Sequence, residues 1–165
     1  MRKLREDSHL PAENWKDWIW AMAPNNTKRV KNLRKRGRDQ EGSVNSKIKD
    51  RLCEQHDNVS TLCGIYEWRI TGNYAAAPRV VYVGSTCAPD SGPCTRMKNR
   101  ILDYCKHGNH KRDLINEALS KGYELWVRFM PTGSQKKAEE KEKDLLKKYD
   151  YAWNKRNYGN IRDIL

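Results

Sequence analysis

Two short segments, at residues 63–68 and 80–84, most constrain the fold of this chain. Each is rich in β-branched and aromatic residues, and the polar stretch between them is rich in turn-forming residues. The pattern predicts two strands joined as a hairpin. Because alternate residues of a strand share a face, Tyr66 and Tyr82 would lie close together if the two faces coincide. Such a tyrosine pair is also typical of ordinary cross-strand packing, and the geometry alone favours that interpretation.

The remainder of the chain predicts one more strand and several helices. A strand is expected at 123–130, where apolar and aromatic residues are followed by Pro131. Apolar residues recurring every three or four positions predict helices at 43–56, 95–106, 110–121 and 134–149. The expected fold is therefore α/β (α+β), with a small, mainly antiparallel three-stranded sheet flanked by helices. Its strands are expected at about 62–70, 79–84 and 123–130.

The first 60 residues differ in composition from the rest. A short aromatic patch at 14–22 is compatible with one helix, which would dock on the main domain or on a partner. Residues 27–38 contain seven Lys or Arg residues and no acidic residue. These patterns predict a basic, aromatic N-terminal extension over 1–60, helical or partly disordered, and a folded domain over 61–165.

The charge of the whole chain indicates a polyanionic partner. With 33 Lys and Arg against 21 Asp and Glu, the net charge is +12, which favours nucleic acid first and an anionic membrane surface second. The basic run has three interpretations: an arm that contacts DNA through Lys31, Arg34 and Arg36, a nuclear import signal, or a solvated basic helix face. An apolar signal region is missing after the basic start, and no apolar run approaches ~18 residues. We therefore expect an intracellular protein that is not secreted and has no membrane partner. The basic run favours a nuclear location, and no small-molecule ligand is expected.

The chain has five cysteines, Cys53, Cys63, Cys87, Cys94 and Cys105. Their odd number and scattered spacing predict reduced thiols in a cytosolic or nuclear protein. Two of them, Cys94 and Cys105, could join His107 and His110 as zinc ligands. That spacing matches no standard zinc-ligand pattern, so structural zinc is the less favoured interpretation.

A carboxylate stands on the packing face of the helix expected at 134–149. Glu142 is four residues after Ala138 and three before Leu145, and both of these belong to the apolar stripe. Burying a carboxylate is costly unless it is paired, protonated or bound to a metal. The sequence therefore leaves two interpretations of Glu142: a metal ligand, or one half of a structural ion pair with an arginine from another element.

Six short elements of the sequence follow one another in a fixed order: Gly64-Ile65-Tyr66, Tyr82-Val83-Gly84, Arg100-Ile101 with Tyr104, His110, Glu142 and Asn154. Together, on the strands and helices expected above, they resemble the GIY-YIG nuclease superfamily over about residues 62–154. The longer spacing before Arg100 is explained by an apparent insertion at 88–93. The segment 149–154, with 162–165 beyond it, also resembles the plant effector-of-transcription branch, in which the domain occurs in DNA-binding regulators.

The resemblance implies hydrolysis of a phosphodiester by in-line attack of water. A base, a cation beside the phosphate oxygens and stabilisation of the leaving oxygen are then required. The family implies Tyr82 as the base and Tyr66 as the group that positions water or phosphate, or the reverse. Arg100 would hold the scissile phosphate, and Glu142 would bind one divalent ion, Mg²⁺ or Mn²⁺. Positive charge from Arg100, the metal and Lys98 would lower the pKa of the tyrosine.

Further residues of the two motifs and the helices are expected to contact the substrate. Ser85 occupies a position where members often have a substrate-contacting residue. Gly84, which leaves room for a close approach, and Lys98, which adds positive charge, are further candidate substrate-binding residues. His110 either assists catalysis or caps its helix, and Asn154 either contacts the substrate or ties the end of the domain to the sheet. The alternative function is a DNA-binding transcriptional regulator that has kept the fold and lost turnover.

Overall fold

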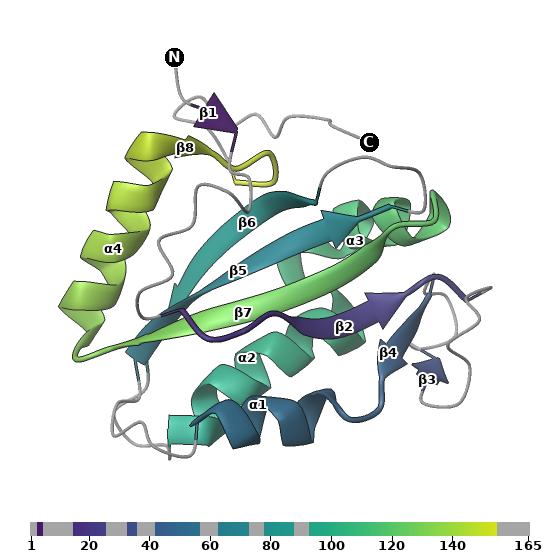
Figure 1. Ribbon diagram of the computed structural model, residues 1–165, viewed down its shortest axis with the longest axis horizontal. Coiled ribbons are helices and arrows are strands. Elements are labelled where there is room, and N and C mark those ends of the chain that lie inside the picture. The colour runs from purple at the N-terminus through teal and green to yellow at the C-terminus, as the bar shows by residue number, and fades with distance from the viewer. Residues whose placement is uncertain are drawn as a thin grey trace.

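The computed structural model describes residues 3–4, 15–25, 33–35, 42–56, 63–72, 78–87 and 93–154. These residues form a mixed α/β fold around a six-stranded antiparallel sheet of order β3–β4–β2–β7–β5–β6 (Figure 1). In chain order the sheet strands are β2 (Ile19–Ala23), β3 (Leu33–Lys35), β4 (Ser43–Asn45), β5 (Cys63–Thr71), β6 (Arg79–Thr86) and β7 (Glu124–Thr132). A separate parallel pairing joins β1 (Lys3–Leu4) to β8 (Tyr149–Asp150).

The helices are α1 (Ile48–His56), α2 (Pro93–His107), α3 (Arg112–Ser120) and α4 (Gln135–Lys148), with a short 3₁₀ turn η3 (Asn109–Lys111) before α3. The predicted helices at 95–106, 110–121 and 134–149 are confirmed. Local signals explain their ends: Gly122, at φ +88°, follows α3 in the left-handed conformation that favours glycine, and the Ser134 side chain accepts the Lys137 N–H at the start of α4. None of the helices in the described ranges is long and apolar enough to cross a membrane.

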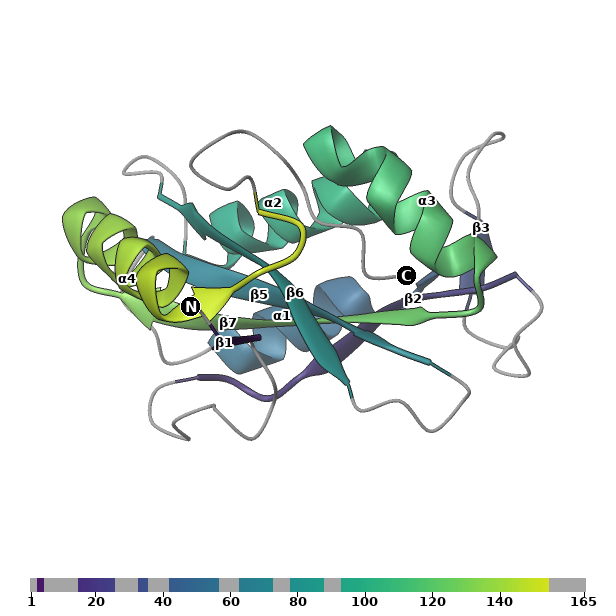
Figure 2. The same cartoon turned by 90° about the horizontal axis from the view of Figure 1, so that it is seen from above.

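The two faces of the sheet carry different helices. On one face, α1, α2 and α3 cover a large apolar core that includes the buried Trp68 and Phe129. Figure 2 shows α2 and α3 on the same side of β7. On the other face, α4 packs on a smaller cluster that includes Ile65, Val83 and Met130. This division follows from strand alternation, because odd and even positions of β5 point to opposite faces.

The three predicted strands are confirmed as β5, β6 and β7, but the predicted three-stranded sheet with a helical N-terminal extension is wrong. Residues 19–23 form a strand on the free edge of β7, with Trp20 opposite Trp126, and β4 and β3 continue the sheet beyond it. Short apolar segments have little periodicity, so the aromatic patch fits either a helix or a strand. Pairing with β7, more than 100 residues away along the chain, decides the outcome.

The predicted helix at 43–56 is also shorter than expected. Residues 43–45 belong to β4, and α1 begins at Ile48. The Asn45 side chain makes the turn between them, since its Oδ1 accepts the Lys47 N–H at 3.0 Å and its Nδ2 donates to the Trp20 carbonyl at 2.9 Å. Asparagine is favoured where the chain changes direction in this way.

The prediction of reduced thiols is not met. Cys63 at the start of β5 is bonded to Cys87, one position beyond the last residue of β6, and Cys53 is also in a disulfide. The hairpin places Cys63 and Cys87 side by side, with their Cα atoms 4.1 Å apart, although they are 24 residues apart in sequence. Cys105 is a buried free thiol. Sequence spacing alone could not identify this cross-strand pair.

Candidate functional site

Three tyrosine hydroxyl groups and one histidine form a continuous polar chain on the face of the sheet that carries α2. The Tyr104 hydroxyl of α2 lies 3.1 Å from the Tyr66 hydroxyl of β5 and 3.3 Å from the Tyr82 hydroxyl of β6. The Tyr82 hydroxyl in turn lies 3.2 Å from Nε2 of His110 in η3. The tyrosines are buried and His110 is exposed. The arrangement therefore offers a hydrogen-bonded path from the interior to solvent.

The register of the hairpin places this chain. Tyr66 is directly opposite Gly84, and Trp68 is opposite Tyr82, so both tyrosines are on the same face of the sheet. The ring centres of Tyr66 and Tyr82 are 6.2 Å apart, which confirms the predicted proximity of the two phenols. Gly84 leaves room for the Tyr66 ring, because a Cβ atom at position 84 would lie 2.6 Å from the Tyr66 hydroxyl oxygen.

Replacing Gly84 with alanine is therefore expected to displace the Tyr66 phenol and to lower the free energy of unfolding by about 1–3 kcal/mol, as overpacking of a core does. Chemical denaturation measures this loss. The matched control is Gly133→Ala, because a Cβ atom at this exposed position would make only ordinary contacts, at 3.5 Å or more, with Lys137. Equal stability of the two variants would contradict the close approach at Gly84.

Burial sets the protonation of the tyrosines. It raises the pKa of Tyr66 well above its usual value of about 10, the neighbouring phenols of Tyr82 and Tyr104 raise it further, and the charge of Arg100 partly opposes them. Burial also raises the pKa of Tyr82, with further contributions from Tyr104 and the negative charge of Glu142. The sequence predicted that nearby positive charge would lower the pKa of Tyr82. In the protein without a bound metal, this pKa is raised instead. Both phenols are neutral at physiological pH.

Glu142 lies on the opposite face of the sheet, where α4 packs. Its carboxylate accepts a short hydrogen bond from the Ser85 hydroxyl of β6, and burial raises the pKa of Glu142 above its ordinary value, partly offset by that bond. Within the described part of the chain no basic side chain forms an ion pair with this carboxylate. The alternative of a structural ion pair with an arginine is not found there.

A divalent cation fits this position. A half-buried carboxylate that has no basic partner among the described residues, beside a hydroxyl group, presents the oxygen ligands that Mg²⁺ and Mn²⁺ prefer. The described residues contain no group of three or more His, Cys, Asp or Glu side chains suited to holding a metal. An ion at Glu142 would therefore keep most of its coordination positions for water and substrate oxygens.

The C-terminal segment after α4 closes over the edge of β6. Asn154 uses its whole side-chain amide on the backbone of Val83, accepting the N–H and donating to the carbonyl at 2.9 Å each. The Trp153 N–H donates to the carbonyl of Val81 at 2.8 Å, where the β5–β6 ladder skips one residue. These bonds satisfy backbone N–H and carbonyl groups on the outer edge of β6, the strand that carries Tyr82. They thereby fix the position of this strand.

Other predicted site residues are less closely tied to the cluster. Arg100 is half-buried on α2, and its charge acts on Tyr66. Lys98 is also half-buried on α2, and no hydrogen bond or ion pair of its side chain is found among the described residues. Lys31 and Arg36 lie outside the described residues. The backbone of Arg34 lies in β3, opposite Val44, and its side chain is likewise outside the description.

Two residues of this site were not among the predicted catalytic or substrate-binding residues, although Tyr104 was part of the predicted motif around Arg100. Tyr104 bridges Tyr66 and Tyr82, and its signal was its place four residues after Arg100 on the apolar stripe of α2. Lys111 is only 4% exposed, donates to the Trp153 carbonyl, and places its ammonium group 5.0 Å from the ring centre of Tyr82. A lysine among charged residues at a helix start gives no sign in the sequence of such burial.

Comparison with known proteins gives one family and two relatives. A family model described as "GIY-YIG domain-containing protein" matches residues 10–164. Protein EFFECTOR OF TRANSCRIPTION 3 of Arabidopsis thaliana is 34% identical over 74 residues, which are 44% of this chain and 27% of that protein. Protein EFFECTOR OF TRANSCRIPTION 2 of the same plant is 29% identical over 93 residues, 44% of this chain and 19% of that protein. The similarity thus spans about a fifth to a quarter of these curated relatives. No solved structure matches the chain.

Proposed function

Because the chain belongs to the GIY-YIG domain family, whose domain is that of a nuclease superfamily, we propose that it is a metal-dependent DNA endonuclease that hydrolyses phosphodiester bonds. The observation that carries the proposal is the hydrogen-bonded chain from Tyr66 through Tyr104 and Tyr82 to the exposed His110. The negative charge of Glu142 contributes to the raised pKa of Tyr82, and Glu142 has no basic partner among the described residues. A polar path of this kind suits proton transfer. The Glu142 carboxylate would repel the phosphates of DNA unless it binds a metal, so its presence favours an enzyme over a simple DNA-binding module.

The raised pKa of Tyr82 decides how it acts as a base. A phenolate is not present at neutral pH, so Tyr82 takes the proton of the attacking water while giving its own proton to Nε2 of His110. This transfer requires the histidine tautomer with an unprotonated Nε2. His110 then releases the proton to solvent because it is exposed. Tyr104 is a positioning residue that holds both phenols.

The phosphate is held by positive charge. Arg100, on α2 beside Tyr66, binds the scissile phosphate through its planar guanidinium group. Glu142, oriented by Ser85, would hold one Mg²⁺ or Mn²⁺, and this ion, when bound, would supply charge stabilisation for the phosphate. Lys111 keeps the Tyr82 ring and the Trp153 carbonyl in place behind the reacting groups.

Metal affinity is expected to fall on acidification at a higher pH than for an ordinary carboxylate. The metal binds the ionised form of Glu142, and burial raises the pKa of Glu142, so protons compete with the metal above the usual carboxylate range. Below that raised pKa, the Mn²⁺ dissociation constant should rise about tenfold per pH unit, as one proton is displaced per metal bound. Calorimetric titration with Mn²⁺ at several pH values measures this profile.

A matched variant tests the cause of the profile. The Ser85 hydrogen bond lowers the pKa of Glu142, so Ser85→Ala should move the fall in affinity to still higher pH. A wild-type profile that falls only within the ordinary carboxylate range, near pH 4.5, would contradict the proposed environment of Glu142.

The function is tested by incubating the purified chain with supercoiled plasmid, with Mg²⁺, with Mn²⁺ and with a chelator. Metal-dependent nicking or linearisation is the expected result. A Tyr82→Phe variant serves as the companion because it keeps the ring and removes the proton-transferring hydroxyl group. Absence of cleavage on plasmid, relaxed duplex and branched DNA alike would reject the nuclease proposal.

A second candidate function is a DNA-binding transcriptional regulator with weak or lost turnover. It is favoured by the two Arabidopsis relatives, which are named as effectors of transcription. A regulator of this kind would act in the nucleus. The neutral state of both phenols also fits a domain without rapid catalysis. Salt-sensitive DNA binding without any metal-dependent cleavage would favour this function over the first.

A further inference from the structure

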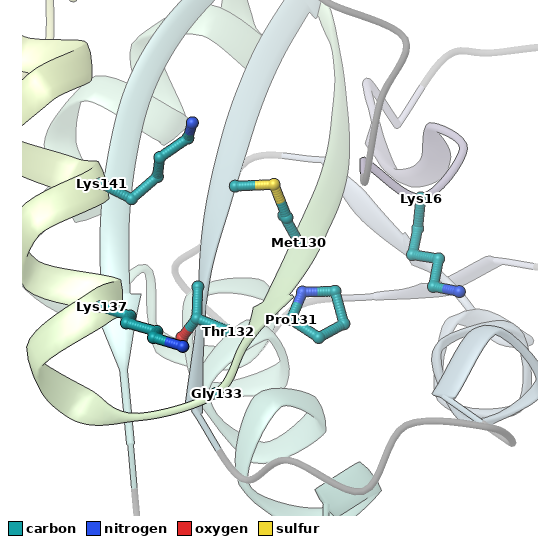
Figure 3. A pocket seen from close by; sticks show the side chains of 7 residues that line it. All are labelled: Lys16, Met130, Pro131, Thr132, Gly133, Lys137 and Lys141. Atoms are coloured by element: carbon teal, nitrogen blue, oxygen red, sulfur yellow. The ribbon is translucent and has the colours of Figure 1, made fainter.

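A hollow lined by lysines lies beside α4, and none of the site residues described above lines it. Its volume is about 450 Å³. It is lined by Lys16, Met130, Pro131, Thr132, Gly133, Lys137 and Lys141. Figure 3 shows Lys137 and Lys141 projecting from α4 on one side, Lys16 on the other, and Met130 and Pro131 between them. None of the described residues that line the hollow is acidic.

The lysines of this hollow are not neutralised by the protein. Within the described part of the chain, none of the three ammonium groups forms an ion pair. By contrast, Lys136 on the outer side of α4 lies 3.9 Å from Glu140, and Lys121 lies 2.7 Å from Glu117. Like charges gathered around one concave surface raise the local concentration of anions. The hollow is therefore electrostatically suited to an anionic group.

The hollow lies on the same face of the sheet as Glu142. Met130 and Ser85 both pair with Ile65, on opposite sides of β5, so they are two strand spacings apart, or about 10 Å. Ser85 donates to Glu142, and Met130 lines the hollow. Lys141 is next to Glu142 in sequence but turned by about 100° around α4, because a helix has 3.6 residues per turn. The two places are thus neighbours on either flank of one helix.

We propose that this hollow binds a backbone phosphate of nucleic acid outside the phosphate that is cleaved. The proposal rests on the proposed function in taking nucleic acid as the ligand. The three lysines provide the charge for the phosphate, and the apolar floor formed by Met130 and Pro131 contacts the adjoining sugar. A strand bound at Glu142 would continue over α4 into the hollow, so the hollow fixes the path of the strand.

The test compares two triple variants that remove the same charge. The hollow variant is Lys16→Ala, Lys137→Ala and Lys141→Ala. The control variant is Lys136→Ala, Lys143→Ala and Lys147→Ala, on the exposed outer surface of α4. Both are made together with Glu142→Ala so that no cleavage occurs, and binding to a short labelled duplex is followed by fluorescence anisotropy over a range of salt concentrations.

The hollow variant is expected to bind at least about tenfold more weakly at low salt and to lose about one unit of the log–log salt slope, since one neutralised phosphate contributes about 0.9. The control variant should lose clearly less of both. Equal losses in the two variants, or none in the hollow variant, would overturn the proposal. Because binding is measured without turnover, this failure is distinct from failure of the nuclease proposal, which the plasmid assay reports.

A second measurement locates the contact without relying on a variant. Brief acylation of the wild-type chain with an amine-reactive ester, followed by peptide mass spectrometry, should show protection by duplex of Lys16, Lys137 and Lys141. Lys143 and Lys147 should stay reactive. Equal protection of the three lysines by inorganic pyrophosphate alone would assign the hollow to a small phosphate and overturn the nucleic-acid assignment.

Discussion

Replacing Glu142 with alanine is expected to lower metal-dependent cleavage by about 10³-fold or more, because a bound cation supplies several kcal/mol of charge stabilisation in such reactions. The plasmid assay with Mg²⁺ measures this loss. DNA binding should be unchanged or tighter, because the variant removes a negative charge from beside a polyanion. The combination of lost turnover and retained affinity distinguishes loss of a metal ligand from general damage to the fold.

Two controls accompany this variant. Glu140→Ala removes a carboxylate from the exposed side of the same helix, and it should cleave like the wild type. Mn²⁺ should raise the melting temperature of the wild type and of Glu140→Ala but not that of Glu142→Ala, because a ligand that binds only the folded state stabilises it. Cleavage at the wild-type rate by Glu142→Ala would remove Glu142 from the metal site.

The fold of Glu142→Ala itself is not expected to suffer. Burial raises the pKa of Glu142, which means that the folded state disfavours its ionised form. For such a group the contribution to stability is greatest below its unfolded pKa and is lost as pH rises through the folded pKa. Above that pKa, removing the carboxylate therefore removes an unfavourable charge, apart from the lost hydrogen bond to Ser85.

The parts of the structure that depend on local sequence could be predicted. Strand alternation placed Tyr66 and Tyr82 on one face, and the hairpin between them brought the phenols together. The helical stripe around Glu142 placed this residue toward the sheet, where it meets Ser85. In each case the information lies within about twenty residues or in one regular repeat.

The parts of the structure that depend on contacts between distant segments could not be predicted from the sequence. β2 is a strand because β7 offers it a free edge, and its own five residues carry no decisive period. The buried Lys111 donates its hydrogen bond to the backbone carbonyl of Trp153, 42 residues later. The pKa of Tyr82 was expected to fall, but burial in the core and the neighbouring Tyr104 raise it. Burial is a property of the assembled fold, and nothing in the flanking residues reports it.

Replacing Arg128 with methionine is expected to lower the free energy of unfolding by about 3–5 kcal/mol, because it leaves the carboxylate of Glu67 buried without its cation. The Glu67 side chain is 0% exposed and that of Arg128 is 5% exposed. Arg128 Nε donates to Glu67 at 2.9 Å, and the Tyr151 hydroxyl donates to the other carboxylate oxygen. Chemical denaturation of the variant against the wild type measures the loss.

An exposed pair of the same residue types serves as the matched control. Arg51 and Glu54 on α1 lie 3.4 Å apart, with side chains 64% and 62% exposed. Arg51→Met should change stability by no more than about 1 kcal/mol, because water screens such pairs. A double variant, Glu67→Leu with Arg128→Met, should recover part of the loss, since it also removes the buried negative charge of Glu67.

The same network links the ends of the fold to the candidate site. The guanidinium of Arg128 lies 4.1 Å from the ring centre of Trp15 and 4.6 Å from that of Trp18, in the segment leading into β2. Tyr151, bonded to Glu67, is two residues before Trp153, whose backbone holds β6 beside Tyr82. Arg128→Met should therefore also weaken cleavage at temperatures where the variant is still folded. Full activity of a destabilised Arg128→Met variant would show that the network supports the fold without positioning Tyr82.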